Sequence, residues 1–224
     1  MKYFMKKLVY LIVFALISCA SSAGSYDDFF RAVRSDNASG VRSLIERGFD
    51  PNTRDEKNQT GLIIALREPS PRVVQVLIDS PKTDVDALNG SGESPLMMAS
   101  LKGQQDVVVK LLARDAAVNK TGWTPLHYAA TSGQISIMKL LLENFAFIDA
   151  QSPNGTTPLM MAAMYGSSDA VKLLLEEGAD TAMKNEQGMT AVDFAKRANR
   201  ESDAAMIAAA AQKKPQALPK EGKW

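Results

Sequence analysis

The feature that most constrains this chain is a ten-residue pattern that returns along it. The segments SPLMMASLKG, TPLHYAATSG and TPLMMAAMYG begin at Ser94, Thr124 and Thr157, and weaker copies begin at Thr60 and Thr190. The five starts are separated by 34, 30, 33 and 33 residues. Residue types that return in phase at such a period predict a repeat protein, in which each unit buries its apolar face against its neighbours.

Apolar residues also return at fixed distances after each start. Alanine stands five positions on, and a bulky aliphatic residue stands seventeen positions on, at Leu77, Leu111, Leu141, Leu174 and Ile207. A sixth copy, without the preceding turn, starts at Asp27 and has Phe29 in the leucine position. We therefore predict a repeat domain over residues 24–211, with six repeats that start near residues 26, 54, 87, 119, 151 and 184.

The residue order within one copy predicts a pair of short helices. Thr or Ser is a good N-cap, and the Pro that follows fits the first helical position, where its missing N–H is not needed. Leu and Ala three residues apart form one buried face. We expect Gly103, Gly133 and Gly166 to end the first helix with a positive φ, and Gly178 to end a second helix over SSDAVKLLLEEG. One such pair cannot bury its own face, so stacking of the pairs must form the core.

This pattern resembles the ankyrin repeat, most closely in GWTPLHYAATSG and VKLLLEEGAD, and the resemblance covers about 185 of the 224 residues. It implies an all-α repeat solenoid, an ankyrin-type stack of about six helix-turn-helix units with β-turn fingers that project to one side. The segment TAVDFAKRAN, from Thr190, is similar to a terminal ankyrin repeat. The resemblance also implies that a partner binds on the concave side of the stack.

His127 is the only histidine of the chain. The resemblance implies a structural role, in which the imidazole hydrogen-bonds the turn backbone and braces adjacent repeats. Other residue types stand at the equivalent positions, so the brace is predicted once: Ile63, Met97, Met160 and Asp193. The sequence contains no phosphate loop, nucleophile elbow or metal-ligand spacing, so we predict no catalytic residue, no metal site and no cofactor.

Residues 1–23 have the pattern of a signal peptide, with a basic start, an apolar run from Leu8 to Ile17 and small residues after it. Leu16 to Cys19 resembles the lipobox of bacterial lipoproteins, which implies a lipid on Cys19. The alternative is ordinary cleavage after Ala20 or Ala23, which removes Cys19. Residues 212–224 are polar and contain two prolines, and we predict that they form a disordered tail.

Charge excludes nucleic acid as the expected partner. Without the leader residues Lys2, Lys6 and Lys7, the chain carries 23 basic and 25 acidic residues. Phosphate binding needs clustered positive charge, which this balance does not provide.

Apolar residues stand where the concave side of an ankyrin stack is open to solvent. Trp and Tyr contribute strongly to binding energy at such places. The predicted partner-binding residues are Leu101, Trp123, Met164, Tyr165, Met189 and Glu93. The alternative is that Trp123 and Met164 pack between repeats.

We therefore expect a monomeric, non-catalytic module that is exported to a bacterial envelope, as a periplasmic protein or a lipoprotein. It binds an unidentified protein partner and touches a membrane only through a lipid on Cys19. One alternative is an inhibitor, immunity or protective accessory protein for a companion toxin or oxidative-defence enzyme. An enzyme is the less favoured alternative.

Overall fold

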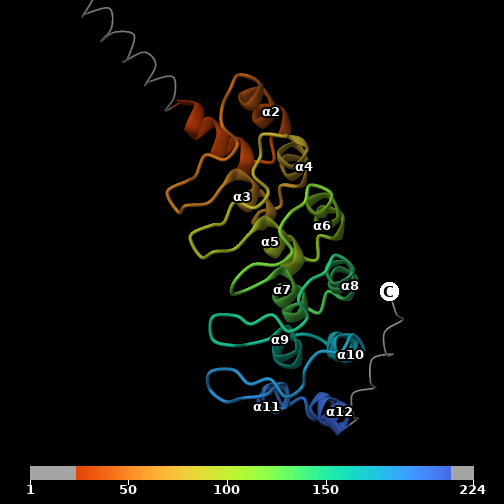
Figure 1. The fold of residues 1–224 in the computed structure, drawn as a ribbon. Coiled ribbons are helices and arrows are strands. Elements are labelled where there is room, and N and C mark those ends of the chain that lie inside the picture. The colour runs from red at the N-terminus through yellow and green to blue at the C-terminus, as the bar shows by residue number, and fades with distance from the viewer. Residues whose placement is uncertain (1–23, 213–224) are drawn as a thin grey trace, which may run out of the picture. The chain divides into compact units, whose positions relative to one another are not determined.

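The computed structural model describes residues 24–212, and the chain divides into two compact parts between Pro95 and Leu96 (Figure 1). The predicted signal peptide with Cys19, and the predicted tail from residue 213 on, lie outside the described residues. The described residues form helices and no strand, apart from one isolated bridge between Arg54 and Thr60, so the predicted all-α repeat fold is confirmed.

The N-terminal part contains the first two repeats. A helix covers residues 24–34 and is followed by α2 (Ala38–Glu46), α3 (Gly61–Arg67) and α4 (Pro71–Asp79). Phe29 is fully buried. A Cβ added to Gly61 would lie only 2.7 Å from the nearest atom of the Phe29 ring. The second repeat therefore begins Thr-Gly instead of Thr-Pro, because the large Phe29 leaves no room for a side chain there.

The C-terminal part contains four helix pairs. They are α5 (Pro95–Lys102) with α6 (Gln105–Leu112), α7 (Pro125–Thr131) with α8 (Ile135–Glu143), α9 (Pro158–Tyr165) with α10 (Ser168–Glu176), and α11 (Ala191–Arg197) with α12 (Glu201–Gln212). Among the first helices, α7 packs on α9 and α9 on α11. The second helices follow one another in the order α6, α8, α10 and α12 (Figure 1).

The repeated apolar positions form the core. None of the five alanines five positions after a start is more than 1% exposed, and all five bulky aliphatic residues seventeen positions on are fully buried. The hydroxyls of Thr60, Thr157 and Thr190 accept the backbone N–H three residues on at 3.4–3.5 Å, as expected for N-caps.

The expected role of the helix-ending glycines is correct at three positions and wrong at one. Gly103, Gly133 and Gly178 have φ values of 69°, 65° and 89°. Gly166 has a φ of −80°, so it does not use the left-handed region. A Cβ on Gly166 would lie 2.3 Å from the carbonyl oxygen of Ala130, so glycine is needed there for the close approach of α9 to the backbone of α7.

Candidate protein-binding surface

Asn and Asp side chains fix the fingers that precede the first helices. In the last finger, Oδ1 of Asn185 accepts the backbone N–H groups of Gln187 and Met189 at 3.1 and 3.0 Å. In the fourth repeat, the Lys120 ammonium donates to the carbonyl oxygens of Thr121 and Trp123 at 3.1 and 3.3 Å. The residue just before each N-cap, such as Trp123 or Met189, is therefore held in a defined position.

Five of the predicted binding residues lie in the C-terminal part, and we call them the finger-side surface. Tyr165 is 59% exposed at the end of α9, whereas the other four side chains are half-buried. Four of them precede or end the first helices α7, α9 and α11, and α9 packs on both α7 and α11. The finger-side surface consists of Leu101, Trp123, Met164, Tyr165 and Met189.

Trp123 both packs and faces solvent. Its ring lies edge-on to the ring of His127, with 5.2 Å between the ring centroids, and the residue is half-buried. The two interpretations of this residue, packing and partner contact, are thus compatible.

Glu93 belongs to the N-terminal part and is engaged within its own finger. Its Oε2 accepts from the Asn89 amide at 2.7 Å, and its backbone N–H donates to Oδ1 of Asn89 at 2.9 Å. Glu93 is half-buried and contributes to the finger of the third repeat.

His127 is fully buried and bridges two repeats. Its Nδ1 lies 3.2 Å from the backbone N–H of Thr124, and its Nε2 lies 2.9 Å from the carbonyl oxygen of Thr156 in the next repeat. A neutral ring with the proton on Nε2 satisfies both groups. Burial lowers the pKa of His127 to about 4, and hydrogen bonds with the backbone of Thr156 and Ala150 oppose that shift only partly.

In two other repeats a different side chain accepts the N–H of the N-cap threonine, so this local half of the brace is not confined to His127. In the fifth repeat, the backbone N–H of Thr157 donates to Sδ of Met160 at 3.4 Å. In the last repeat, Oδ2 of Asp193 accepts the backbone N–H of Thr190 and its hydroxyl, both at 2.7 Å. These hydrogen bonds from Thr190 hold the pKa of Asp193 below its usual range. The local half of the brace therefore recurs with a carboxylate, because a carboxylate oxygen also accepts an orphan N–H at a helix start.

Two exposed phenylalanines were missed by the sequence reasoning, and we call Phe145 and Phe147 the phenylalanine patch. They follow α8 and are 85% and 66% exposed. The signal was available, because Phe145 stands in ENFAF where the next repeat has Gly178 in EEGAD. Like Gly178, Phe145 has a positive φ, of 63°.

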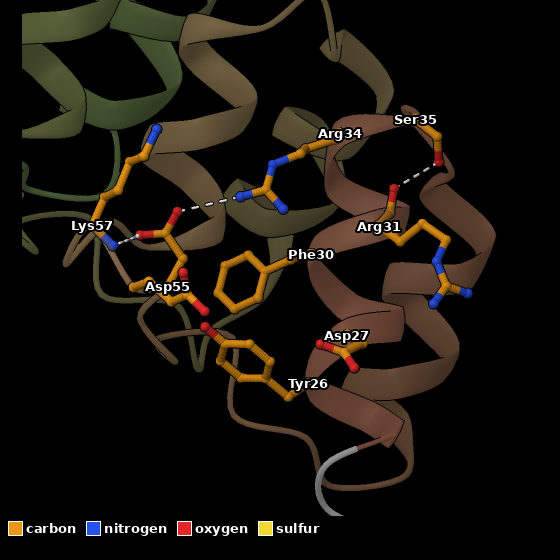
Figure 2. A pocket seen from close by; sticks show the side chains of 9 residues that line it. Tyr26, Asp27, Phe30, Arg31, Arg34, Ser35, Asp55 and Lys57 are labelled. Atoms are coloured by element: carbon orange, nitrogen blue, oxygen red, sulfur yellow. Dashed lines mark hydrogen bonds and ion pairs between the residues drawn. The ribbon is translucent and has the colours of Figure 1, made fainter.

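An open pocket lies in the N-terminal part, between the helix over residues 24–34 and the first finger (Figure 2). The Arg34 guanidinium is 3.3 Å from Oδ2 of Asp55, and its carbon lies 5.7 Å from the centroid of the Phe30 ring. No finger precedes the first repeat in the part of the chain that the structure describes, so the pocket lies against the first described finger. Its central charges are paired with each other, and they do not form a nucleophile–base arrangement.

Two further findings bear on function. Within residues 24–212, no three His, Cys, Asp or Glu residues are grouped to hold a metal ion. No helix in that range is long and apolar enough to cross a membrane.

Family models for ankyrin repeats match residues 29–119, 62–152 and 141–195. The chain therefore belongs to the ankyrin repeat family, whose members are typically non-catalytic scaffolds that mediate protein–protein interactions.

Three similar proteins each match about half of this chain. Human neurogenic locus notch homolog protein 2 is 32% identical over 123 residues, which is 54% of this chain and 5% of that protein. The rat ankyrin repeat and SAM domain-containing protein 6 is 32% identical over 108 residues, or 46% and 12% of the two chains. The mouse B-cell lymphoma 3 protein homolog is 32% identical over 118 residues, or 50% and 26%. The chain thus spans about a quarter or less of the length of these relatives.

Proposed function

We propose that the chain is a binding module that holds one protein partner on the finger-side surface, the concave face of the sequence-based prediction. The observation that carries this proposal is Tyr165, which is 59% exposed at the end of α9 and directly follows the half-buried Met164. Tyrosine presents a large, stiff apolar area with a polar end, and such residues anchor protein interfaces.

The setting of these residues supports binding through a preformed surface. The Asn185 and Lys120 contacts fix the backbone just before Met189 and at Trp123, so little order must be gained on association. A surface that is already ordered loses less entropy on binding. The matches cover about half of this chain and about a quarter or less of each relative, so the relatives' names do not transfer a partner to this chain.

The test is affinity capture with the wild type and with the double variant Trp123→Ala, Tyr165→Ala. We expect the double variant to lose the specific partner. The matched control is Val109→Ala, which removes a side chain that is 46% exposed on α6 and is expected to retain the partner. Retention of every specific partner by the double variant would exclude this surface.

We also propose that the protein acts outside the cytoplasm of a bacterium, an inference that the sequence of residues 1–23 alone supports. Mass spectrometry of the mature N-terminus tests it. An acylated Cys19 would mark a lipoprotein, a terminus at Ser21 or Gly24 would mark a cleaved periplasmic protein, and an intact Met1 would contradict export. The inhibitory or protective accessory role remains the alternative, and the identity of the captured partner decides between the two.

A further inference from the structure

The phenylalanine patch follows a second helix, α8, whereas the finger-side surface belongs to the first helices and the residues before them, so the patch needs a separate explanation. Phe145 is the most exposed large apolar side chain among the described residues. It also has a left-handed backbone conformation, which is unfavourable for a residue with a Cβ. Exposure and backbone strain combined at one aromatic residue indicate a contact that the described residues do not provide.

The backbone of the patch is held by Asn119, at the start of the same repeat. The Asn119 amide donates to the carbonyl oxygen of Phe145 at 2.8 Å, and its Oδ1 accepts the N–H of Phe147 at 2.8 Å. Both rings are therefore presented from a fixed segment and not from a loose loop.

Carboxylates precede and follow the patch in the chain and occupy nearby positions in the neighbouring repeats. Glu143 precedes Phe145 by two residues, and Asp149 follows Phe147 by two. Oδ1 of Asp149 accepts the N–H of Asp180 in the next repeat at 2.9 Å. Asp115 occupies the position of Phe145 in the preceding repeat, whose helix α6 packs on α8.

Within residues 24–212, no ion pair involves any of these four carboxylates. Burial, and to a smaller extent the charge of Asp180, raises the pKa of Asp149. The complement of this surface is therefore a segment with positive charge and apolar side chains.

The chain itself contains such a segment directly after α12. Residues 213–224 carry one glutamate and four lysines, together with two large apolar side chains, at Lys213, Lys214, Lys220, Lys223, Leu218 and Trp224. Ile207 occupies the same repeat position as Leu174 and Leu141. Four residues further on, Ala211 therefore corresponds to Gly178 and to Phe145. The chain thus leaves α12 at the repeat position that Phe145 occupies after α8, two repeats earlier.

The distance is within reach. Packed helices lie about 8–10 Å apart, so the steps from α12 to α10 and from α10 to α8 amount to about 20 Å. Twelve extended residues span up to about 40 Å. A tether of this length gives an effective concentration in the roughly millimolar range, so a weak contact is sufficient.

We propose that residues 213–224 bind back onto the phenylalanine patch of the same chain, with their lysines beside these four carboxylates and their apolar side chains on Phe145 and Phe147. This inference concerns a different surface from the proposed function and does not depend on it.

Zero-length carbodiimide cross-linking of the full chain tests the proposal, because it joins lysines to carboxylates only where they touch. In the monomer band, mass spectrometry should find tail lysines joined to Glu143, Asp149, Asp180 or Asp115 in preference to other exposed carboxylates such as Asp169 and Glu201. The ion pair of Lys172 with Glu176, at 3.8 Å, is the internal positive control.

The double variant Phe145→Gly, Phe147→Ala keeps every carboxylate and should lower the tail cross-links about tenfold, the factor for a loss of about 1.4 kcal/mol of contact. Tyr165→Ala, which removes an exposed aromatic side chain from the finger-side surface, should leave them unchanged. Three outcomes would each overturn the proposal. The lysine cross-links could be spread evenly over the surface, they could occur only between two copies in a dimer band, or the double variant could leave them unchanged.

Discussion

The fourth repeat (residues 119–150) and the fifth (residues 151–183) each form one pair of short helices, but three equivalent positions have different roles in them. His127 stands opposite Met160, Gly133 opposite Gly166, and Phe145 opposite Gly178. His127 bonds to the next repeat, Gly166 allows a close backbone approach, and Phe145 presents an exposed ring, whereas the residue opposite each of them does not have that role. The comparison teaches that the ankyrin pattern fixes which side chains are buried, whereas the neighbouring repeat decides what each shared position must do.

The largest difference is expected at the helix-ending glycines. Gly166→Ala places a Cβ 2.3 Å from the carbonyl oxygen of Ala130, where neither backbone can yield, and should destabilise the fold by roughly 3 kcal/mol or more. Gly133→Ala meets mainly the left-handed φ of 65° and should cost about 1–2 kcal/mol. Denaturant unfolding of both variants measures the difference, and equal losses would contradict the distinct roles assigned to the two glycines.

The next effect is a dependence of stability on pH that only the fourth repeat provides. The folded pKa of His127, about 4, lies below the unfolded value of about 6.5, so folding favours the neutral ring. This contribution is complete above pH 6.5 and is lost as the pH falls towards 4, by roughly 2 kcal/mol between pH 7 and about pH 4.5.

The variant His127→Met, which copies the fifth repeat, is the control for that effect. It should be less stable at pH 7, because the carbonyl oxygen of Thr156 loses its bond to Nε2, and it should lack this part of the pH dependence. Parallel pH profiles for variant and wild type would show that His127 does not titrate as proposed.

A smaller effect on the free energy of unfolding is expected at Phe145 and Gly178, the equivalent residues that follow the second helices of the two repeats. Phe145→Gly removes the cost of a left-handed backbone conformation in a residue with a Cβ, and should stabilise the fold by about 1 kcal/mol. Any contact free energy that the ring gains from residues 213–224 would reduce this stabilisation. The mirror variant Gly178→Ala, at a φ of 89°, should destabilise by a similar amount. Thermal unfolding measures both, and a destabilised Phe145→Gly variant would mean that the ring contributes more than its backbone conformation costs.

The smallest effect on stability is expected from Tyr165→Ala. The side chain is 59% exposed, so its removal should change the free energy of unfolding by no more than about 0.5 kcal/mol. Ser132, the equivalent residue of the fourth repeat, is likewise exposed. Chemical denaturation would check this, and a loss well beyond that range would assign Tyr165 to packing and weaken its role in partner binding.

The sequence was informative wherever a residue acts within its own repeat. The caps at Thr60, Thr157 and Thr190 and the buried Ala and Leu positions depend on spacing along one helix pair, which the period reveals directly. It was less informative where two repeats meet. The reason for Gly166 is an oxygen 36 residues earlier in the chain, and no pattern within one repeat contains that information.

By itself, the sequence determined the repeat period, the helical class and the identity of the core positions, because these follow from local propensity and from apolar spacing. Only the tertiary structure decided how much of Trp123 and Tyr165 faces solvent, which glycine is needed for close approach, and that Phe145 and Phe147 are presented together. These properties depend on which backbone lies beside each residue in the next repeat, and that neighbour is fixed by packing and not by sequence distance.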